Sequence, residues 1–395
     1  IMGCDSVTFA PITTNSIQEI SGTDVIFVIG ANVTESHPII GLEIKKALRN
    51  GKTLIVADTR KVWLAKKAQT FLNLQPGTDA SLVNAIISVI IKEKLHDEKY
   101  IEKRTDKFKT LNSAITKNDI SKAVKLTGVS QDAIEEAARI YANAENAIIL
   151  YGNGITQHRS GNDNVKSLVN LALLTGNVGK ECSGIYPLMG QNNGQGAFNM
   201  GALPDFYTDS QPVSDINVRK KLEKIYKTKL SKNKGLQIRE MFDAASKGKV
   251  KAMYVMGADP VMSEPDTTKV KKALSKLDFL VVQDIFMSNT AQYADVVLPA
   301  ACFAEKDGTF TNMERRVQRI RKTVKPPGEA KADWNIISEL STCMGSPMNY
   351  SSPEAIWEEI RKVSPNFAGI NYRRLDSGGI QWPCPKADHP GTKFL

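Results

Sequence analysis

The sequence feature that most restricts the fold of this chain is an ordered pattern of strand, glycine turn, helix, strand and acid. Residues 24–29 form a short, apolar, β-branched run that breaks at Gly30, and a helix-like stretch follows. A second apolar run at residues 53–57 ends at Asp58, before a third apolar patch at residues 71–74. Continuous apolar strands joined by helices are typical of parallel sheets. The pattern therefore predicts an α/β fold.

The same order returns in the second half of the chain. The apolar run at residues 251–256 breaks at Gly257, and after a helix-like stretch the run at residues 279–283 ends at Asp284. The glycine and the acid are 28 positions apart in the first copy and 27 in the second. Because several features match in order, we interpret them as a repeat. We expect two Rossmann-like, doubly wound parallel-sheet domains related as a pseudo-repeat, plus a C-terminal tail belonging to a further domain.

Glycines and acids at these positions suit nucleotide binding. A glycine at the end of a strand lets the backbone approach a phosphate, and the following helix start offers free N–H groups. An acid that ends the next strand can accept hydrogen bonds from a ribose or a base. For Asp58 or Asp284 taken alone, capping of a helix is an equal explanation. Both acids in register favour two nucleotide-sized ligands, or one dinucleotide across a pair; neither copy has the G-x-G-x-x-G motif of NAD proteins.

Two further loops carry candidate binding residues. The apolar run at residues 147–151 opens into a glycine-rich loop that ends with Gln157 and His158, and we interpret His158 as a hydrogen-bonded structural residue. The stretch 189–204 gathers side-chain amides, which can read the edge of a pterin or purine without adding charge. Gly-Asn clusters also build ordinary loops, so that alternative stays open.

Two charged segments are ambiguous. Arg315 and Arg316 follow a stretch rich in glycine, hydroxyl and amide groups, and they could hold a pyrophosphate or a partner carboxylate, or form a polar hairpin. The basic run at residues 219–234 suits a solvated amphipathic helix better than a binding face.

Composition excludes several classes of protein. The net charge of +10 is compatible with anionic cofactors or acidic partners, but we find no interleaved aromatics or motif for nucleic acid. No apolar run is long enough to span a bilayer, and the first residues do not form a signal peptide. The five cysteines are scattered, with no metal-ligand spacing, so we expect no metal ligands in this chain and a cytoplasmic location. Hydrolase, protease and NTPase motifs are absent from the sequence, which leaves the chemistry to a bound cofactor.

Longer strings of the sequence resemble one family. FVIGANVTESHP, VADTRK, QPGTDASLVNA, GNGITQH, LALLTGNVGK, GQNNGQGAFNMGALP, VMGADPVMSEPD, VVQDIFMSNTAQYADVVLPA, GTFTNMERRVQR and GIQWPCP are similar to the large (alpha) subunit of molybdopterin-dependent formate dehydrogenases, in the family's order and over nearly the whole chain. The resemblance implies molybdenum or tungsten held between two molybdopterin guanine dinucleotides, one for each half of the pseudo-repeat.

The resemblance also implies the site residues. One dinucleotide would be lined by Gly30, Asn32, Asp58, Arg60, Gly77, Asp79, Gly154 and Gln157. The other would be lined by Gly257, Asp259, Gln283, Asp284 and Thr290. The loop of Gly190, Gln191, Asn192 and Asn193 would lie near the metal, with Met189 and Gln191 at the catalytic positions.

Three departures from the family bear on function. The family's cysteines for a [4Fe-4S] cluster, and the cysteine or selenocysteine that ligates the metal, are expected before Ile1. Its carboxyl-terminal domain is expected after Leu395. Met189 stands where formate dehydrogenases have an arginine thought to hold the formate carboxylate, a contact that a thioether cannot replace.

We therefore expect the central fragment of an enzyme that oxidises formate to CO2 and passes electrons to an iron–sulfur cluster, with partner electron-transfer subunits. The fragment alone is expected to be inactive. Met189 leaves two alternatives: a relative that acts on another small substrate, or a non-catalytic scaffold. The expected domains are residues 1–188 and 189–302, which bind one dinucleotide each, and residues 303–395, a tail that packs with segments outside this sequence.

Overall fold

The computed structural model describes residues 12–115 and 119–395, so Cys4 lies outside the described residues. The chain divides into two compact units. The first runs to Gln195 and includes Thr311–Arg316 and Gly391–Leu395, and the second comprises Gly196–Phe310 and Val317–Pro390. The division into segments 1–188, 189–302 and 303–395 stays a prediction.

The strands are β1 (Val25–Ile29), β2 (Thr53–Ala57), β3 (Thr70–Leu72), β4 (Ala147–Tyr151), β5 (Gly184–Pro187), β6 (Phe206–Tyr207), β7 (Gln211–Pro212), β8 (Ala252–Met256), β9 (Phe279–Asp284), β10 (Val296–Pro299), β11 (Gly308–Thr311), β12 (Arg316–Ile320) and β13 (Ile380–Gln381). The α-helices are α2 (Val33–Ser36), α3 (Pro38–Arg49), α4 (Asp79–Lys92), α5 (Glu98–Arg104), α6 (Phe108–Ile115), α7 (Ile120–Thr127), α8 (Gln131–Ala142), α9 (Asn153–Thr156), α10 (Gly161–Leu174), α11 (Gly194–Asn199), α12 (Ile216–Tyr226), α13 (Ile238–Ser246), α14 (Pro260–Ser263), α15 (Thr267–Leu274), α16 (Asp333–Cys343), α17 (Pro353–Val363) and α18 (Tyr372–Leu375). Short 3-10 turns are η1 (Ile17–Gly22), η2 (Leu64–Lys66), η3 (Thr208–Ser210), η4 (Ala291–Tyr293), η5 (Phe303–Glu305) and η6 (Pro365–Phe367).

The first unit is built on a five-stranded parallel sheet in the order β3-β2-β1-β4-β5. The central strand β1 pairs Val25 with Thr53 on one side and with Ala147 on the other. Every residue of β1 and β4 is buried, which explains why these strands appear in the sequence as continuous apolar runs.

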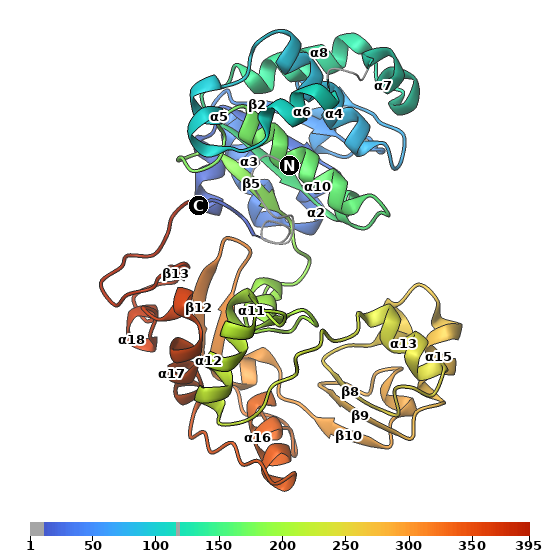
Figure 1. The fold of residues 1–395 in the computed structure, drawn as a ribbon, viewed down its shortest axis with the longest axis vertical. Coiled ribbons are helices and arrows are strands. Elements are labelled where there is room, and N and C mark those ends of the chain that lie inside the picture. Colours follow the sequence, from blue (N-terminus) through green and yellow to red (C-terminus); the bar gives the residue numbers. More distant parts are fainter. Residues whose placement is uncertain (1–11, 116–118) are drawn as a thin grey trace. The chain divides into compact units, whose positions relative to one another are not determined.

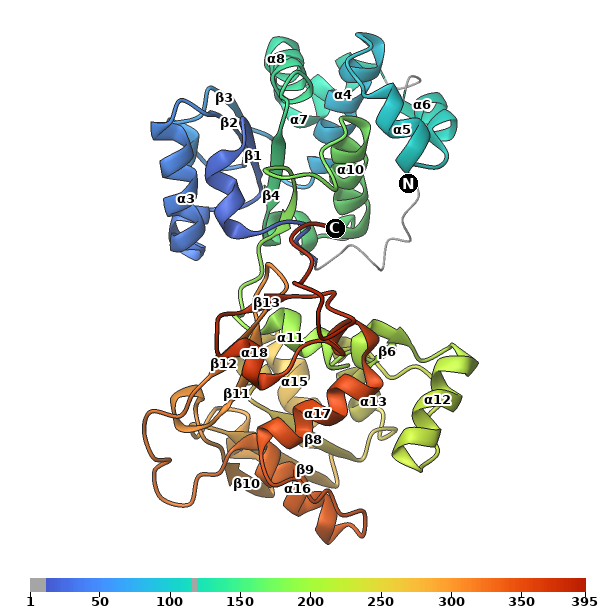
Figure 2. The ribbon, with the colours of Figure 1, turned by 90° about the vertical axis from the view of Figure 1, so that its left-hand side faces the viewer.

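Helices cover both faces of this sheet, as Figure 2 shows for α3 on one side and α4 and α10 on the other. Phe27 and Ile29 point into a cluster with α4, α8 and α10, whereas Ile26 and Val28 point into a second cluster with α3. This alternation follows from the two-residue period of a strand. The first unit is therefore the doubly wound α/β fold that the sequence predicts.

The second unit contains a three-stranded parallel sheet in the order β10-β9-β8 (Figure 1). Helices α13 and α15 pack on one face of it, where Phe242, Val270 and Leu280 belong to one buried cluster. The strands β8, β9 and β10 follow one another as β1, β2 and β3 do in the first unit. The predicted mixed α/β architecture with parallel sheets is confirmed.

The two glycines of the repeat have matching backbones. Gly30 has φ +58° and Gly257 has φ +59°, the left-handed region that favours glycine. The N–H of Gly30 donates to the carbonyl of Ala57 at 3.0 Å, and that of Gly257 donates to the carbonyl of Gln283 at 2.9 Å. Both glycines therefore turn the chain at the carboxyl end of the first strand and tie it to the second.

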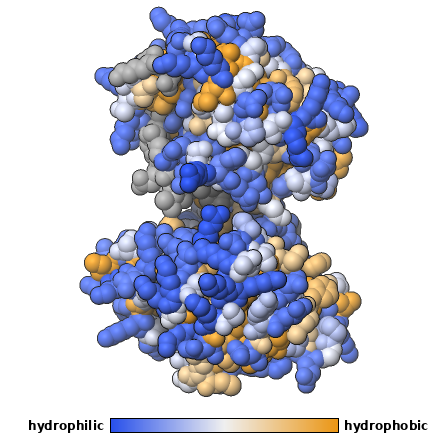
Figure 3. Space-filling view, turned by 90° about the vertical axis from the view of Figure 1, so that its right-hand side faces the viewer, coloured by the Kyte–Doolittle hydropathy of each residue, from blue (hydrophilic) through white to orange (hydrophobic). Residues whose placement is uncertain are grey.

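The outer face of the β8–β10 sheet leaves large apolar side chains exposed, and Figure 3 shows hydrophobic residues interrupting the hydrophilic surface of the second unit. Met256 is 49% exposed and Phe279 is 45% exposed. Exposed apolar patches promote association.

We expect the chain to self-associate in light scattering, and the double variant Met256→Lys with Phe279→Lys to do so less. The single variant Leu126→Lys, on α7, is the control; equal scattering by the double variant and the unsubstituted chain would refute this.

The rest of the second unit surrounds a smaller aromatic core. The ring of Trp357 on α17 lies against Phe367, with 6.1 Å between ring centroids, and its Nε1 donates to the carbonyl of Ile370 at 2.7 Å. Strand β13 joins β11 and β12 in a three-stranded sheet.

An ion pair beside β1 makes the first unit sensitive to acid. Lys52 Nζ lies 2.9 Å from Asp24 Oδ1, and this hydrogen bond lowers the pKa of the Asp24 carboxyl. A lowered folded pKa adds stability above the ordinary value, and that stability is lost as pH falls through the folded pKa. Because the pair is partly exposed, we expect the contribution to stay below about 1 kcal/mol. Asp24→Asn should lower the melting temperature near neutral pH and have less effect at acidic pH; an equal loss at both would contradict this.

Candidate cofactor site

The carboxyl ends of β1, β2 and β4 surround a cavity of about 350 Å³ within the first unit. Its lining residues are Gly30, Ala31, Asn32, Asp58, Thr59, Arg60, Leu74, Pro76, Gly77, Asp79, Gly154 and His158. Seven of the eight residues that the sequence analysis assigned to the first dinucleotide are among them. This size lies in the range of sites for small molecules and nucleotides.

Close approach of two loops requires the glycines. The N–H of Gly154 donates to the carbonyl of Gly30 at 3.1 Å, and a Cβ on Gly154 would lie 2.7 Å from that oxygen. Gly77 has φ +80° and nothing within 4 Å of an added Cβ, so its main reason to be glycine is the backbone conformation. Gly30, Gly77 and Gly154 therefore leave backbone bare at three places in the cavity wall, where a phosphate could approach.

Charged groups of both signs line this cavity. The Asp58 carboxylate accepts a hydrogen bond from the N–H of Arg60 at 2.9 Å, which orders the turn after β2. Asp79 begins α4, and burial raises the pKa of its carboxyl. The side chains of Arg60 and His158 are exposed and can donate to an anion. The cavity thus combines hydrogen-bond acceptors for a base or ribose with donors for phosphate.

Two residues differ from the sequence expectation at this cavity. His158 lines it, although we interpreted that residue as structural, and Gln157 is not among the lining residues. Gln157 and His158 are neighbours in the sequence, and no local pattern shows which of the two side chains faces the cavity.

The corresponding residues of the second unit bond to one another. The Asp259 carboxylate accepts from the N–H of Thr290 at 3.0 Å and from its hydroxyl at 2.6 Å, and also from Asn289. The structure thereby joins the turn after β8 to the turn after β9. Thr290 is fully buried in this contact.

The other second-unit candidates lie at the end of β9. Gln283 is buried; its amide donates to Asp333 at 2.6 Å and accepts from the Tyr254 hydroxyl. The Asp284 carboxylate accepts from the N–H of the next residue, Ile285, at 2.7 Å. The sequence analysis missed Tyr254 and Asp333, because residues 79 positions apart carry no common pattern.

Part of the amide loop, residues 189–193, forms hydrogen bonds within the first unit. His37 Nε2 lies 2.8 Å from the Met189 carbonyl oxygen, and the Asn193 side chain accepts from the N–H of Thr311 at 2.8 Å. Gly190, Gln191 and Asn192 are exposed, so Gln191 and Asn192 can contact a ligand.

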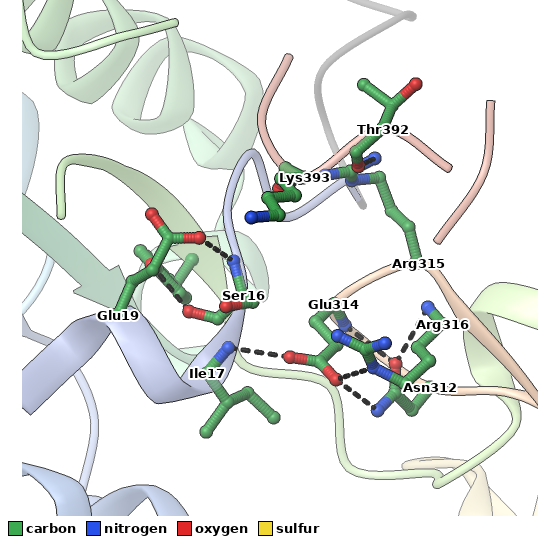
Figure 4. A network of polar contacts seen from close by, with 10 residues as sticks. Ser16, Ile17, Glu19, Asn312, Glu314, Arg315, Arg316, Thr392 and Lys393 are labelled. Carbon is green, nitrogen blue, oxygen red and sulfur yellow. Dashed lines mark hydrogen bonds and ion pairs between the residues drawn. The ribbon is translucent and has the colours of Figure 1, made fainter. Parts of the chain in front are cut away.

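The paired arginines are used inside the protein (Figure 4). Arg315 is fully buried and donates to the carbonyl oxygens of Thr13, Thr14, Thr392 and Lys393 at 2.7 to 3.1 Å. Arg316 donates to Glu314 at 2.6 Å. The hypothesis of binding to a pyrophosphate or a partner carboxylate is therefore wrong for Arg315 and stays a prediction for the partly exposed Arg316. The polar-hairpin alternative agrees with the adjacent strands β11 and β12.

The part of the chain that the structure describes has neither a cluster of metal-ligating side chains nor a helix that could span a membrane. In residues 12–115 and 119–395 no group of three or more His, Cys, Asp or Glu side chains could hold a metal ion. Cys182, Cys302, Cys343 and Cys384 are free thiols. None of the described helices is both long and apolar enough to cross a bilayer.

Comparison with known proteins decides the family. The family model for molybdopterin oxidoreductases matches residues 4–343. The chain belongs to the molybdopterin oxidoreductase family. Its match to this family also confirms the resemblance on which the site residues were assigned.

Several molybdopterin oxidoreductases are similar over almost all of this chain. The alpha subunit of the F420-dependent formate dehydrogenase of Methanocaldococcus jannaschii is 51% identical, over 97% of this chain and 57% of that protein. Formate dehydrogenase H of Escherichia coli is 42% identical, over 96% of this chain and 54% of that protein. The chain thus spans about half the length of the curated relatives it matches.

A solved structure has the same fold. Acetylene hydratase from Pelobacter acetylenicus superimposes with a TM-score of 0.73 at 23% identity, over 94% of this chain and 53% of that one. At this identity the likeness concerns the fold alone.

The first-unit cavity fits the cofactor class that the family implies. Its glycines, the exposed Arg60 and His158, and the acids Asp58 and Asp79 offer backbone, cationic and acceptor groups that a polar, anionic molybdopterin cofactor can contact. In the second unit the Asp259 carboxylate already accepts hydrogen bonds from the buried Thr290 and from Asn289, and the assignment of Asp259 and Thr290 to a dinucleotide stays a prediction.

Proposed function

We propose that this chain forms the cofactor-binding centre of a formate dehydrogenase-like enzyme, which converts formate to CO2, a proton and two electrons. The electrons would pass to an iron–sulfur cluster and then to a partner subunit. The observation that carries the proposal is the first-unit cavity, where Gly30, Asp58, Arg60, Asp79 and Gly154 meet. The similarity to formate dehydrogenase alpha subunits supports formate as the substrate class.

The cofactor is proposed to be two molybdopterin guanine dinucleotides that share molybdenum or tungsten. When bound, this group would supply the two-electron chemistry. The chain's own residues would bind and orient it: the first-unit cavity would hold one dinucleotide, and the turns after Gly257 and Asp284 would hold the other. Gln191 and Asn192 are proposed to reach the pterin side through their exposed amides.

Met189 supports a second candidate within the same family. Its side chain packs against Gly194, where an added Cβ would lie 2.7 Å from the Met189 methyl carbon. A thioether cannot make a charge-assisted hydrogen bond to a carboxylate. The alternative substrate is therefore a small molecule that needs no cation at this position, and a scaffold without metal is the third possibility. The scattered cysteines favour a reducing, cytoplasmic location for each of these.

The test is metal and pterin analysis of the protein expressed from its full reading frame, with molybdate and tungstate supplied. We expect about one metal and two guanine dinucleotides per chain, and loss of both on Asp58→Ala with Asp284→Ala. Formate-dependent reduction of a dye then distinguishes formate from another substrate. Absence of metal and pterin would favour the scaffold, and unchanged content in the double variant would refute the site assignment.

A further inference from the structure

The strongest unexplained feature of the second unit is a basic arm, residues 219–234. It contains eight lysines and arginines and one acid, Glu223. It comprises most of α12 and the loop that follows, and Figure 2 shows α12 at the margin of its unit. The proposed cofactor site uses none of these residues.

The arm is held in place by hydrogen bonds. The Tyr207 hydroxyl donates to the carbonyl of Ser231 at 2.6 Å, and the N–H of Leu230 donates to Glu223 at 3.1 Å. Just beyond the arm, the N–H of Gly235 donates to the carbonyl of Pro204 at 2.8 Å. The loop lysines therefore sit on an anchored backbone.

Helix α12 exposes lysines and buries one leucine. Leu222 is only 1% exposed and anchors α12 in the second unit. Lys220 and Lys224 are exposed and four positions apart, which places them on one side of the helix, and the exposed Lys227 directly follows its last residue. Like charges at this spacing destabilise a helix. Lys227 also adopts φ +53°, an unfavourable backbone for a lysine.

The acids near the arm are already engaged. Asp205 pairs with Lys234 at 3.2 Å, Asp215 caps the start of α12, and Glu223 accepts from Leu230 and lies 3.9 Å from Arg219. Within the described residues, no ion pair is recorded for Lys220, Lys224, Lys227, Lys229 or Lys232, which we call the lysine face. This face can accept carboxylates from another molecule.

We infer that the lysine face is a docking surface for an acidic patch on a partner protein. Complementary charge steers such encounters and sets their orientation. A membrane is a poorer partner, because an interfacial helix inserts a continuous exposed apolar face, whereas Leu222 is buried and the exposed apolar residues Ile216 and Tyr226 stand at opposite ends of α12. Single-stranded nucleic acid is also poorer, because binding it needs stacked aromatic rings and the arm has only Tyr226.

The test compares two triple variants of the full-length protein. The first is Lys220→Glu, Lys224→Glu, Lys227→Glu. The matched control is Lys99→Glu, Lys103→Glu, Lys107→Glu, which changes the net charge by the same amount. Lys99 and Lys103 lie one turn apart on α5, and Lys107 follows this helix with φ +62°. The control lysines stand among four acids, Asp97, Glu98, Glu102 and Asp106.

The probe is a fluorescent polyglutamate peptide, titrated by anisotropy at low salt. We expect the first variant to weaken binding about tenfold or more, the control to weaken it about threefold or less, and added salt to abolish the difference. Parallel titrations use single-stranded RNA and phosphatidylglycerol vesicles. Equal losses in both variants, no peptide binding by the unsubstituted protein, or tighter binding of RNA or vesicles than of peptide would overturn the inference. Because binding needs no loaded cofactor, these outcomes are independent of the proposed function.

Discussion

Replacing Arg315 with methionine should remove about 3–5 kcal/mol from the free energy of unfolding of the first unit. The guanidinium joins three stretches of chain, residues 13–14, 315 and 392–393, through four backbone carbonyl oxygens. Burial lowers the pKa of Arg315 to about 10, so it stays charged at neutral pH. Methionine fills a similar space but donates to none of these carbonyls, and of the four the Thr14 carbonyl keeps a hydrogen bond from the N–H of Leu395 at 3.0 Å. A buried carbonyl left without a donor costs about 1–3 kcal/mol before relaxation.

Amide hydrogen exchange locates the effect. The N–H of Thr14 donates to the carbonyl of Ile185 at 3.1 Å, and the N–H of Ile185 donates to the Thr14 hydroxyl at 2.9 Å. Both amides should exchange about a hundredfold faster or more in Arg315→Met, because their segment loses its anchor. Arg321→Met is the control: Arg321 is exposed and pairs with Asp376, so the expected loss is below about 1 kcal/mol. Unchanged exchange at Thr14 and Ile185 would show that the buried arginine is not what holds them.

Gly154→Ala should abolish cofactor binding by the full-length protein while costing about 1–3 kcal/mol of stability. The new Cβ would lie 2.7 Å from the Gly30 carbonyl oxygen and 2.9 Å from its Cα, so backbone must move. Both glycines line the cavity, and the shift would change the wall that is proposed to face the phosphates. We expect metal and pterin contents to fall about tenfold or more.

The matched control is Gly308→Ala. An added Cβ there meets nothing within 4 Å, and its backbone is outside the left-handed region. This variant should keep its metal, its pterin and its unfolding midpoint. Full cofactor content in Gly154→Ala would contradict both the cavity assignment and the importance of the close approach.

Local sequence patterns determined the α/β architecture and its repeat. The apolar runs at residues 53–57 and 147–151 are β2 and β4 without any change of bounds, because strands buried on both faces consist mostly of apolar residues. The repeat was also readable, since Gly30 and Gly257 each stop a strand and need a backbone that glycine adopts easily. The resemblance, and not periodicity, then supplied the cofactor and most of the residues that line the cavity.

Tertiary structure alone decided what each polar side chain contacts. The sequence analysis considered Arg315 as a ligand of pyrophosphate, but in the folded chain this residue donates to carbonyl oxygens of Thr13 and Lys393. Asp259 looked available to a ligand, yet it bonds to Thr290, 31 positions away. Apolar burial is set by a residue's own chemistry and its spacing along one element, so it can be predicted from the sequence. A hydrogen-bond partner depends on which distant segments the fold brings within about 3 Å, and no local pattern contains that information.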